Sequence, residues 1–111
     1  MHAELNFITA LPSEARPLID HYGLRRSARG RGITLYETDG VRLAVSGIGK
    51  AASAYAVGVI AGIAGDTTEQ LWLNVGIAGH AHVPRGTIGI AHRIDDTATS
   101  RHRQDLDGTT E

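Results

Sequence analysis

Short apolar runs recur along the chain, and polar or glycine-rich stretches separate them. Runs that are rich in aliphatic and β-branched side chains predict strands. We expect five strands, over residues 5–10, 33–38, 41–46, 71–75 and 87–94. The dipeptide Asp39-Gly40 lies between the second and third runs and predicts a hairpin, because this pair favours tight two-residue turns.

Two of the stretches between these runs predict helices. Pro12 and Ser13 open the first, apolar residues at i, i+3, i+4 and i+7 give it one apolar face, and Gly23 ends it. The second helix is expected over residues 51–64, where small side chains predominate, and Gly65 ends it. Strands that alternate with helices predict a three-layer α/β fold, in which helices flank a mixed sheet.

Composition and charge narrow the class of protein. The 111 residues suffice for one domain, and 41% hydrophobic with 21% charged residues is typical of a globular fold. A formal net charge of −1 gives no electrostatic sign of nucleic-acid or membrane binding, and the arginines at 25, 26, 29 and 31 are expected in a solvated loop. There is no cysteine, no signal peptide and no apolar run long enough to span a bilayer, so we expect a soluble, cytoplasmic protein.

Three of the expected loops follow strands, where ligands collect in α/β sheets because backbone N–H groups are exposed there. In the first, Glu14 falls in the first helical turn. Its carboxylate either only stabilises the helix start, or it acts as a general base that activates water or binds a sugar hydroxyl. The second loop lacks the Walker A pattern, because Ala51 follows Lys50 where serine or threonine is needed. Its glycines are expected to allow close approach of a ligand or another loop, with nucleotide phosphate binding as the alternative.

The third loop, residues 74–80, ends in a glycine and a histidine. His80 and His82, together with His92, offer imidazoles to a metal ion. No acid or thiolate joins them at ligand spacing, so we expect exposed loop histidines and no metal site.

Taken in order, the three loops resemble the superfamily of purine nucleoside phosphorylases and methylthioadenosine/S-adenosylhomocysteine nucleosidases. The matching stretches are Ile8-Thr9-Ala10-Leu11-Pro12-Ser13-Glu14-Ala15, Val45-Ser46-Gly47-Ile48-Gly49-Lys50-Ala51, Asn74-Val75-Gly76-Ile77-Ala78-Gly79 and, as the turn into a further strand, Pro84-Arg85-Gly86-Thr87-Ile88-Gly89. The likeness covers residues 5–96. It implies a nucleoside phosphorylase-like fold and a role in nucleoside metabolism. The implied reaction is cleavage of the N-glycosidic bond of purine nucleosides, by water in a hydrolase or by phosphate in a glycosyltransferase.

The resemblance also implies which residues form the site. Glu14 matches the acid that activates water, and it is the expected catalytic residue. The expected substrate-binding residues are Ile48 on the ribose or substituent side of the pocket, the backbone of Ala78 and Gly79 against the purine, and Ala10 and Ile77. No cofactor is implied apart from phosphate as a co-substrate. The implied partners are a purine nucleoside and further copies of the chain in a homo-oligomer.

The chain departs from the family in two respects. Asn74, a nucleosidase-like residue, stands where one branch of phosphorylases has arginine, and Ile77 replaces a phosphate-binding serine. Phosphate would then have to be bound by one of three other arginines, Arg16, Arg42 or Arg85.

The second departure is length. Family members are more than twice as long, and their second half supplies the acids that protonate the purine and hold the ribose hydroxyls. We therefore expect residues 1–96 to be the N-terminal part of such a domain, and residues 97–111 to be a polar tail that is disordered or truncated. The hypothesis is an incomplete enzyme of this family. The alternative is a non-catalytic nucleoside-binding or remnant domain without turnover.

Overall fold

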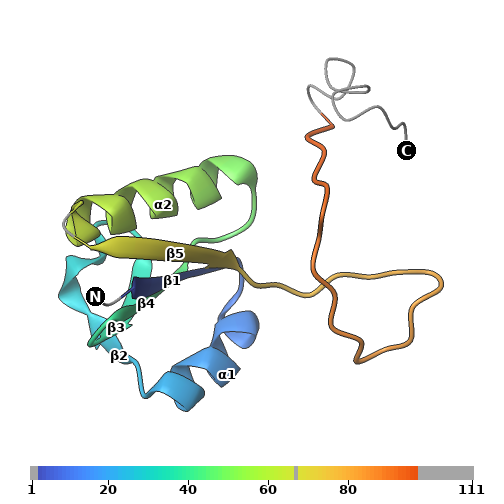
Figure 1. Cartoon of the computed structure of the whole chain (residues 1–111), viewed down its shortest axis with the longest axis horizontal. Helices are drawn as coiled ribbons and strands as arrows, with labels where there is room; N and C mark the ends of the chain where they lie inside the picture. Colours follow the sequence, from blue (N-terminus) through green and yellow to red (C-terminus); the bar gives the residue numbers. More distant parts are fainter. Residues whose placement is uncertain (1–2, 67, 98–111) are drawn as a thin grey trace. The chain divides into compact units, whose positions relative to one another are not determined.

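A computed structural model describes residues 3–66 and 68–97 of the chain. It shows a small α/β domain, in which a five-stranded mixed sheet carries two α-helices (Figure 1). The elements in chain order are β1 (Ala3–Thr9), α1 (Pro12–Tyr22), β2 (Arg25–Ser27), the 3-10 helix η1 (Ala28–Gly30), β3 (Thr34–Thr38), β4 (Val41–Val45), α2 (Lys50–Ala64) and β5 (Glu69–Asn74). Described residues up to Ala78 form one compact unit, and those from Gly79 form a second unit.

The sheet of the first unit has the strand order β2-β3-β4-β1-β5. β1 runs parallel to both of its neighbours, with Phe7 opposite Leu43 on β4 and opposite Leu73 on β5. β3 is antiparallel to β4 and to β2. Because β1, β4 and β5 point the same way, their carboxyl ends lie at one edge of the sheet.

The two helices cover opposite faces of the sheet, since successive residues of a strand point to opposite sides. Phe7 and Leu43 pack with Ile19 of α1 in one core cluster. Ile8 and Ala44, their neighbours in sequence, pack under α2 in the other cluster, which also contains Leu35, Ala56 and Ile60. The expected three layers are therefore present, with α1 and α2 on either side of the sheet (Figure 1).

Four of the five expected strands and both expected helices are confirmed, each within two residues of its expected ends. The hairpin between β3 and β4 turns at Gly40, whose φ of 77° is a conformation that glycine adopts without strain. α1 ends as expected at Gly23, which is left-handed with a φ of 66°. These signals are local, so the sequence alone could carry them.

Two expectations about elements are wrong. Residues 87–94 form no strand, and Ile88, Ile90 and Ile94 are 92%, 95% and 83% exposed. Their alternation suits a strand, but a strand needs a partner's N–H and C=O groups, and no described strand pairs with them. Conversely, Arg25–Ser27 is not a solvated loop but the strand β2, paired with β3. Of the expected polar tail only Thr97 is described; the rest lies outside the described residues.

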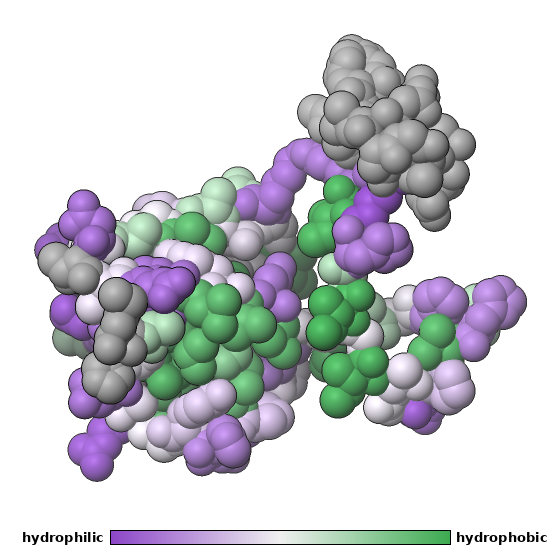
Figure 2. Space-filling view, viewed as in Figure 1, coloured by the Kyte–Doolittle hydropathy of each residue, from purple (hydrophilic) through white to green (hydrophobic). Residues whose placement is uncertain are grey.

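β5 forms an edge of the sheet and leaves apolar side chains in solvent. Among the described strands it pairs with β1 alone, and the helices pack mainly on β1 and β4. Leu71, Trp72 and Leu73 are 52%, 37% and 39% exposed. Figure 2 shows hydrophobic side chains gathered on this face, in the region that β5 crosses in Figure 1. Neither helix of the described residues has the length and apolar character that a membrane span requires.

Candidate functional site

The loops that follow the parallel strands are joined to one another at the carboxyl edge of the sheet. The Ser46 N–H donates to the Thr9 carbonyl at 2.8 Å, and the Gly47 N–H donates to the Ala10 carbonyl at 3.1 Å. These bonds tie the loop after β4 to the loop after β1. The Gly47 N–H is thereby occupied, which argues against this loop as a phosphate cradle, because such a cradle needs free N–H groups.

The carboxylate of Glu14 joins the loop after β1 to the loop after β5. Its Oε1 accepts hydrogen bonds from the backbone N–H groups of Ala10 and Leu11, both at 3.0 Å, and its Oε2 accepts one from the Ile77 N–H at 2.9 Å. We call these three bonds the Glu14 clasp. Gly76 leaves room for it, since a Cβ at this position would lie only 3.2 Å from Oε2.

The clasp determines the chemistry of this carboxylate. The N–H of Ile77, then that of Leu11 and that of Ala10, hold the pKa of Glu14 below its ordinary value of 4.5, because they stabilise the charged form. The group is therefore ionised at neutral pH and is a weak base for removing a proton. A carboxylate oxygen accepts about two hydrogen bonds. Oε1 already has two and Oε2 has one, so Oε2 can accept one more from a water or a hydroxyl.

Large apolar side chains are exposed on all three loops at this edge. Leu11 follows β1, Ile48 follows β4 and Ile77 follows β5, and they are 39%, 80% and 77% exposed. Binding sites commonly combine apolar walls with a few fixed polar groups. An ionised carboxylate among apolar loops therefore suits a ligand with one polar and one apolar part.

The structure brings together only some of the predicted site residues. Ala10 and Ile77 contact Glu14 through their backbone N–H groups. Ile48 and Ala78 belong to loops at the same edge but take no part in the clasp. Gly79 is the first residue of the second unit.

Arg42 is not a phosphate ligand at this edge, although it was one of the arginines considered for that role. It lies near the start of β4, the end of the strand away from the loops. Its guanidinium pairs with Glu4 at 2.7 Å and with Glu37 at 3.8 Å, and it donates to the Asn6 Oδ1 at 3.3 Å. Of the other two arginines, Arg16 is exposed on α1, and Arg85 belongs to the second unit.

The buried polar cluster around Asn6 was missed from the sequence. Asn6 is fully buried on β1, between β4 and β5, and its Nδ2 donates to the Gln70 Oε1 on β5 at 2.8 Å. Together with the Arg42 contact, this joins β4, β1 and β5 by side chains and favours one register. The only signal was an amide in an otherwise apolar run, which is costly to bury without partners.

The lowered pKa values of three carboxyl groups predict how the stability of the fold depends on pH. Arg42 lowers the pKa of Glu4, the Ile77 N–H lowers that of Glu14, and Arg29 lowers that of Glu37, all from an ordinary value of 4.5. A carboxyl group whose pKa is lower in the folded than in the unfolded protein stabilises the fold at any pH above its unfolded-state pKa. This stabilisation is lost as the pH falls from the unfolded-state pKa through the folded-state pKa. We therefore expect the melting temperature to be flat from pH 7 to about 5 and to fall below about 4.5.

Thermal melts followed by circular dichroism across this range test the prediction. Glu37→Gln should flatten part of the fall, because this carboxylate is the partner of Arg29 and of the Ser27 hydroxyl. A melting temperature that rises on acidification would contradict the assigned directions of the three shifts.

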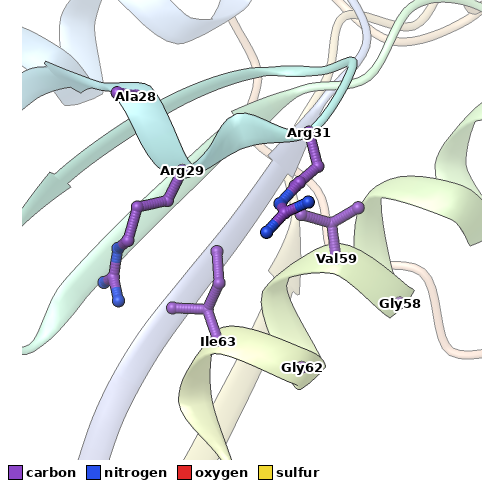
Figure 3. A pocket seen from close by; sticks show the side chains of 7 residues that line it. All are labelled: Ala28, Arg29, Arg31, Gly58, Val59, Gly62 and Ile63. Atoms are coloured by element: carbon purple, nitrogen blue, oxygen red, sulfur yellow. The ribbon is translucent and has the colours of Figure 1, made fainter.

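Two hollows lie beside α2, and their walls contain none of the predicted site residues. The larger, about 560 Å³, is lined by Ala28, Arg29, Arg31, Gly58, Val59, Gly62 and Ile63 (Figure 3). The smaller, about 330 Å³, is lined by Ile8, Ser53, Val57, Trp72, Leu73 and Asn74. The helix therefore has a hollow along each flank.

The histidines of the second unit are described together. The rings of His80 and His82 lie 6.0 Å apart, and the His82 N–H donates to the His80 Nδ1 at 3.0 Å. This bond occupies the Nδ1 lone pair of His80. Within residues 3–66 and 68–97, no three His, Cys, Asp or Glu side chains are grouped as metal ligands.

No protein-family model, curated protein or solved structure matches the chain. The resemblance to nucleoside phosphorylases and nucleosidases therefore rests on the sequences of the loops. Function has to be inferred from the edge where these loops meet.

Proposed function

We propose that the chain is a nucleoside phosphorylase/nucleosidase-family protein. In this proposal, the carboxyl edge of the sheet, where the Glu14 clasp lies, binds a purine nucleoside for cleavage of the N-glycosidic bond. The observation that carries this proposal is the Glu14 clasp. It fixes an ionised carboxylate between two strand-end loops and leaves one acceptor position on Oε2. A carboxylate fixed in this way costs little reorganisation when a ligand binds.

The chemistry of glycosidic cleavage gives this carboxylate a role. As the bond from C1′ to the purine nitrogen breaks, its electrons leave with the purine, and the sugar acquires oxocarbenium character. A negative charge near the sugar stabilises this state, and Oε2 orients an attacking water or a ribose hydroxyl by accepting its hydrogen bond. The departing purine takes its proton from solvent water, because the clasp contains no acid that could donate it, and the proton that the attacking water loses returns to solvent.

The surroundings of the carboxylate suit a nucleoside. The exposed side chains of Leu11 and Ile77 provide apolar surface for a purine and that of Ile48 for the ribose side of the ligand, while the sugar hydroxyls face the carboxylate. The backbone of Ala78, which follows the clasp residue Ile77 in sequence, is proposed to lie against the base.

Water is the nucleophile that the edge favours over phosphate. The ionised Glu14 repels a phosphate dianion, and the Gly47 N–H is already bonded. Arg42 is engaged with Glu4 at the other end of β4. We therefore place hydrolysis ahead of phosphorolysis.

A second candidate function is nucleoside binding without turnover. The observation that favours it is the lowered pKa of Glu14, since a carboxylate of low basicity binds a hydroxyl more readily than it removes a proton.

Titration with adenosine, adenine and ATP tests the proposed ligand. We expect adenosine to bind with a Kd of about 1 mM or below, with NMR shifts at the amides of Leu11, Ile77 and Ala78. ATP should bind no more tightly than adenosine, because its phosphates face the Glu14 carboxylate. Much tighter binding of ATP, or shifts confined to other residues, would refute the proposed site. Chromatographic detection of released adenine then separates turnover from binding alone.

A further inference from the structure

The larger hollow beside α2 has two walls of different chemistry. One wall is the segment that follows β2, which carries the side chains of Arg29 and Arg31, and the other is the second half of α2 (Figure 3). Its volume of about 560 Å³ is in the range of small-molecule sites. The loop after β4, at the carboxyl edge, leads into the start of this helix, so the hollow is separate from the proposed nucleoside site.

The helix wall of the hollow is apolar and partly without side chains. Val59 and Ile63 contribute aliphatic side chains. Gly58 and Gly62, four residues apart, lie on one row of the helix, and a Cβ added at either would meet no atom within 4 Å. The helix backbone therefore forms an open floor, which can contact an alkyl chain but offers it no polar side chain.

The opposite wall carries one positive charge that is not balanced by a neighbour. The Arg29 guanidinium donates to both carboxylate oxygens of Glu37, from its Nε at 3.0 Å and from its Nη2, so these two residues together add no net charge. The guanidinium of Arg31 is exposed and forms no ion pair with a described residue. The hollow thus combines an apolar floor with a single uncompensated cation.

The segment that carries the arginines is fixed before any ligand binds. The Ser27 hydroxyl accepts a hydrogen bond from the Arg29 N–H at 3.1 Å, and the Tyr55 hydroxyl of α2 donates to the Arg31 carbonyl. The Tyr55 bond joins the two walls directly. A site whose walls are already fixed loses less conformational freedom on binding than a flexible one.

We infer that this hollow binds an amphipathic monoanion, of which a medium-chain carboxylate is the simplest example. The carboxylate pairs with Arg31, because a guanidinium and a carboxylate match in shape and form two parallel hydrogen bonds. The alkyl chain lies on the floor at Gly58 and Gly62, where its burial removes apolar surface from water. Glu37 does not repel the ligand strongly, since Arg29 balances its charge.

Calorimetric titration with octanoate, 1-octanol, octyltrimethylammonium and acetate separates the head group from the chain. We expect octanoate to bind with a Kd of about 1 mM or below. 1-Octanol should bind about 5-fold more weakly or worse, because it lacks the charge-assisted bonds to Arg31. The cation and acetate should not bind measurably. Decanoate should bind more tightly than octanoate, by about 2-fold or more for each added methylene.

Substitutions in each wall test the two halves of the site, each against a matched control. Arg31→Gln should raise the octanoate Kd by about 10-fold or more and leave 1-octanol binding unchanged. Arg25→Gln removes an exposed arginine of β2 that does not line the hollow, and should have no effect. Gly62→Leu fills the floor and should abolish binding of both ligands. Ala61→Leu, at an exposed position of the same helix outside the hollow, should not. Circular dichroism melts show whether each variant is folded, and leucine favours a helix over glycine.

Several results would overturn the inference. One is binding of octyltrimethylammonium as tight as that of octanoate, and another is octanoate binding that survives Gly62→Leu. Equal losses in Arg25→Gln and Arg31→Gln would indicate a diffuse surface attraction and no site. Binding to phosphatidylglycerol vesicles without binding of free octanoate would assign the arginines to a membrane surface instead. None of these measurements involves Glu14 or a nucleoside, so the inference and the proposed function can fail separately.

Discussion

Glu14→Gln is expected to lower hydrolysis of a purine nucleoside by about 10²-fold or more. Glutamine keeps one oxygen but replaces the other with an NH₂ group, which cannot accept a hydrogen bond. Either Ala10 and Leu11 or Ile77 then loses its acceptor. The substitution thus removes the charge beside the sugar and opens the clasp between the loops. Phosphorolysis should fall less, because phosphate needs no activation by this group.

Initial rates of hydrolysis and phosphorolysis measure the effect on turnover, and hydrogen exchange of the Ala10, Leu11 and Ile77 amides measures the clasp. Glu4→Gln is the matched control, since Glu4 lies near the start of β1, away from the loops, and should leave both rates unchanged. Equal hydrolysis rates with glutamate and glutamine at position 14 would remove this residue from the mechanism. Unchanged exchange rates at all three amides, Ala10, Leu11 and Ile77, would show that the clasp does not hold the loops together. If the native chain releases no adenine, the second candidate function, nucleoside binding without turnover, is favoured. The hydrogen-exchange measurement still tests the clasp in that case.

The second large effect is expected from Leu43→Ala, which should reduce the free energy of unfolding by about 3 kcal/mol. Leu43 is fully buried on β4, where it packs with Phe7 and Ile19 beneath α1. Removing its branched end leaves a cavity between a sheet and a helix that cannot both collapse around it. The free energy of unfolding of a native domain is only about 5 to 15 kcal/mol in total, so the expected loss is a large share of the stability.

Urea unfolding followed by circular dichroism measures this loss. Leu71→Ala is the matched control, because it makes the same chemical change on β5, where the leucine is 52% exposed. We expect the control to cost less than about 1 kcal/mol, in proportion to the smaller apolar area removed from water. Equal losses at the two positions would mean that the edge strand is covered in solution, which would contradict the exposure described here.

Local signals predicted most of the fold. Asp39-Gly40 predicted the hairpin, and Gly23 predicted the end of α1. The spacing of apolar residues predicted the buried face of that helix. β2 was missed because three polar residues carry no strand signal of their own. That strand forms because its backbone pairs with β3 and because Glu37 on β3 binds the side chains of Ser27 and Arg29. Pairing is a property of two segments, so it is not visible in one of them.

The same distinction applies to the candidate site. The position of Glu14 after a strand, in the first turn of a helix, was readable from the sequence, as was the meeting of parallel strand ends. The bond from the Ile77 N–H was not, because Ile77 is 63 residues away and contributes a backbone group that any residue carries. Arg42 could be assigned to phosphate only because the sequence does not show that Glu4 lies beside it.

The order of the strands in the sheet also sets the order in which the chain can assemble. The β3–β4 hairpin joins strands that are neighbours in sequence. Side chains on β1, in contrast, form hydrogen bonds with side chains 36 residues later on β4 and 66 residues later on β5. Contacts that close longer loops cost more chain entropy and form later. As the chain leaves the ribosome, β5 is the last of the described strands to arrive, and the Ile77 N–H can reach Glu14 only after β5 has docked. A nascent chain therefore lacks the proposed binding edge until β5 has joined the sheet, and an opening at β5 would disrupt this edge before the rest of the domain unfolds.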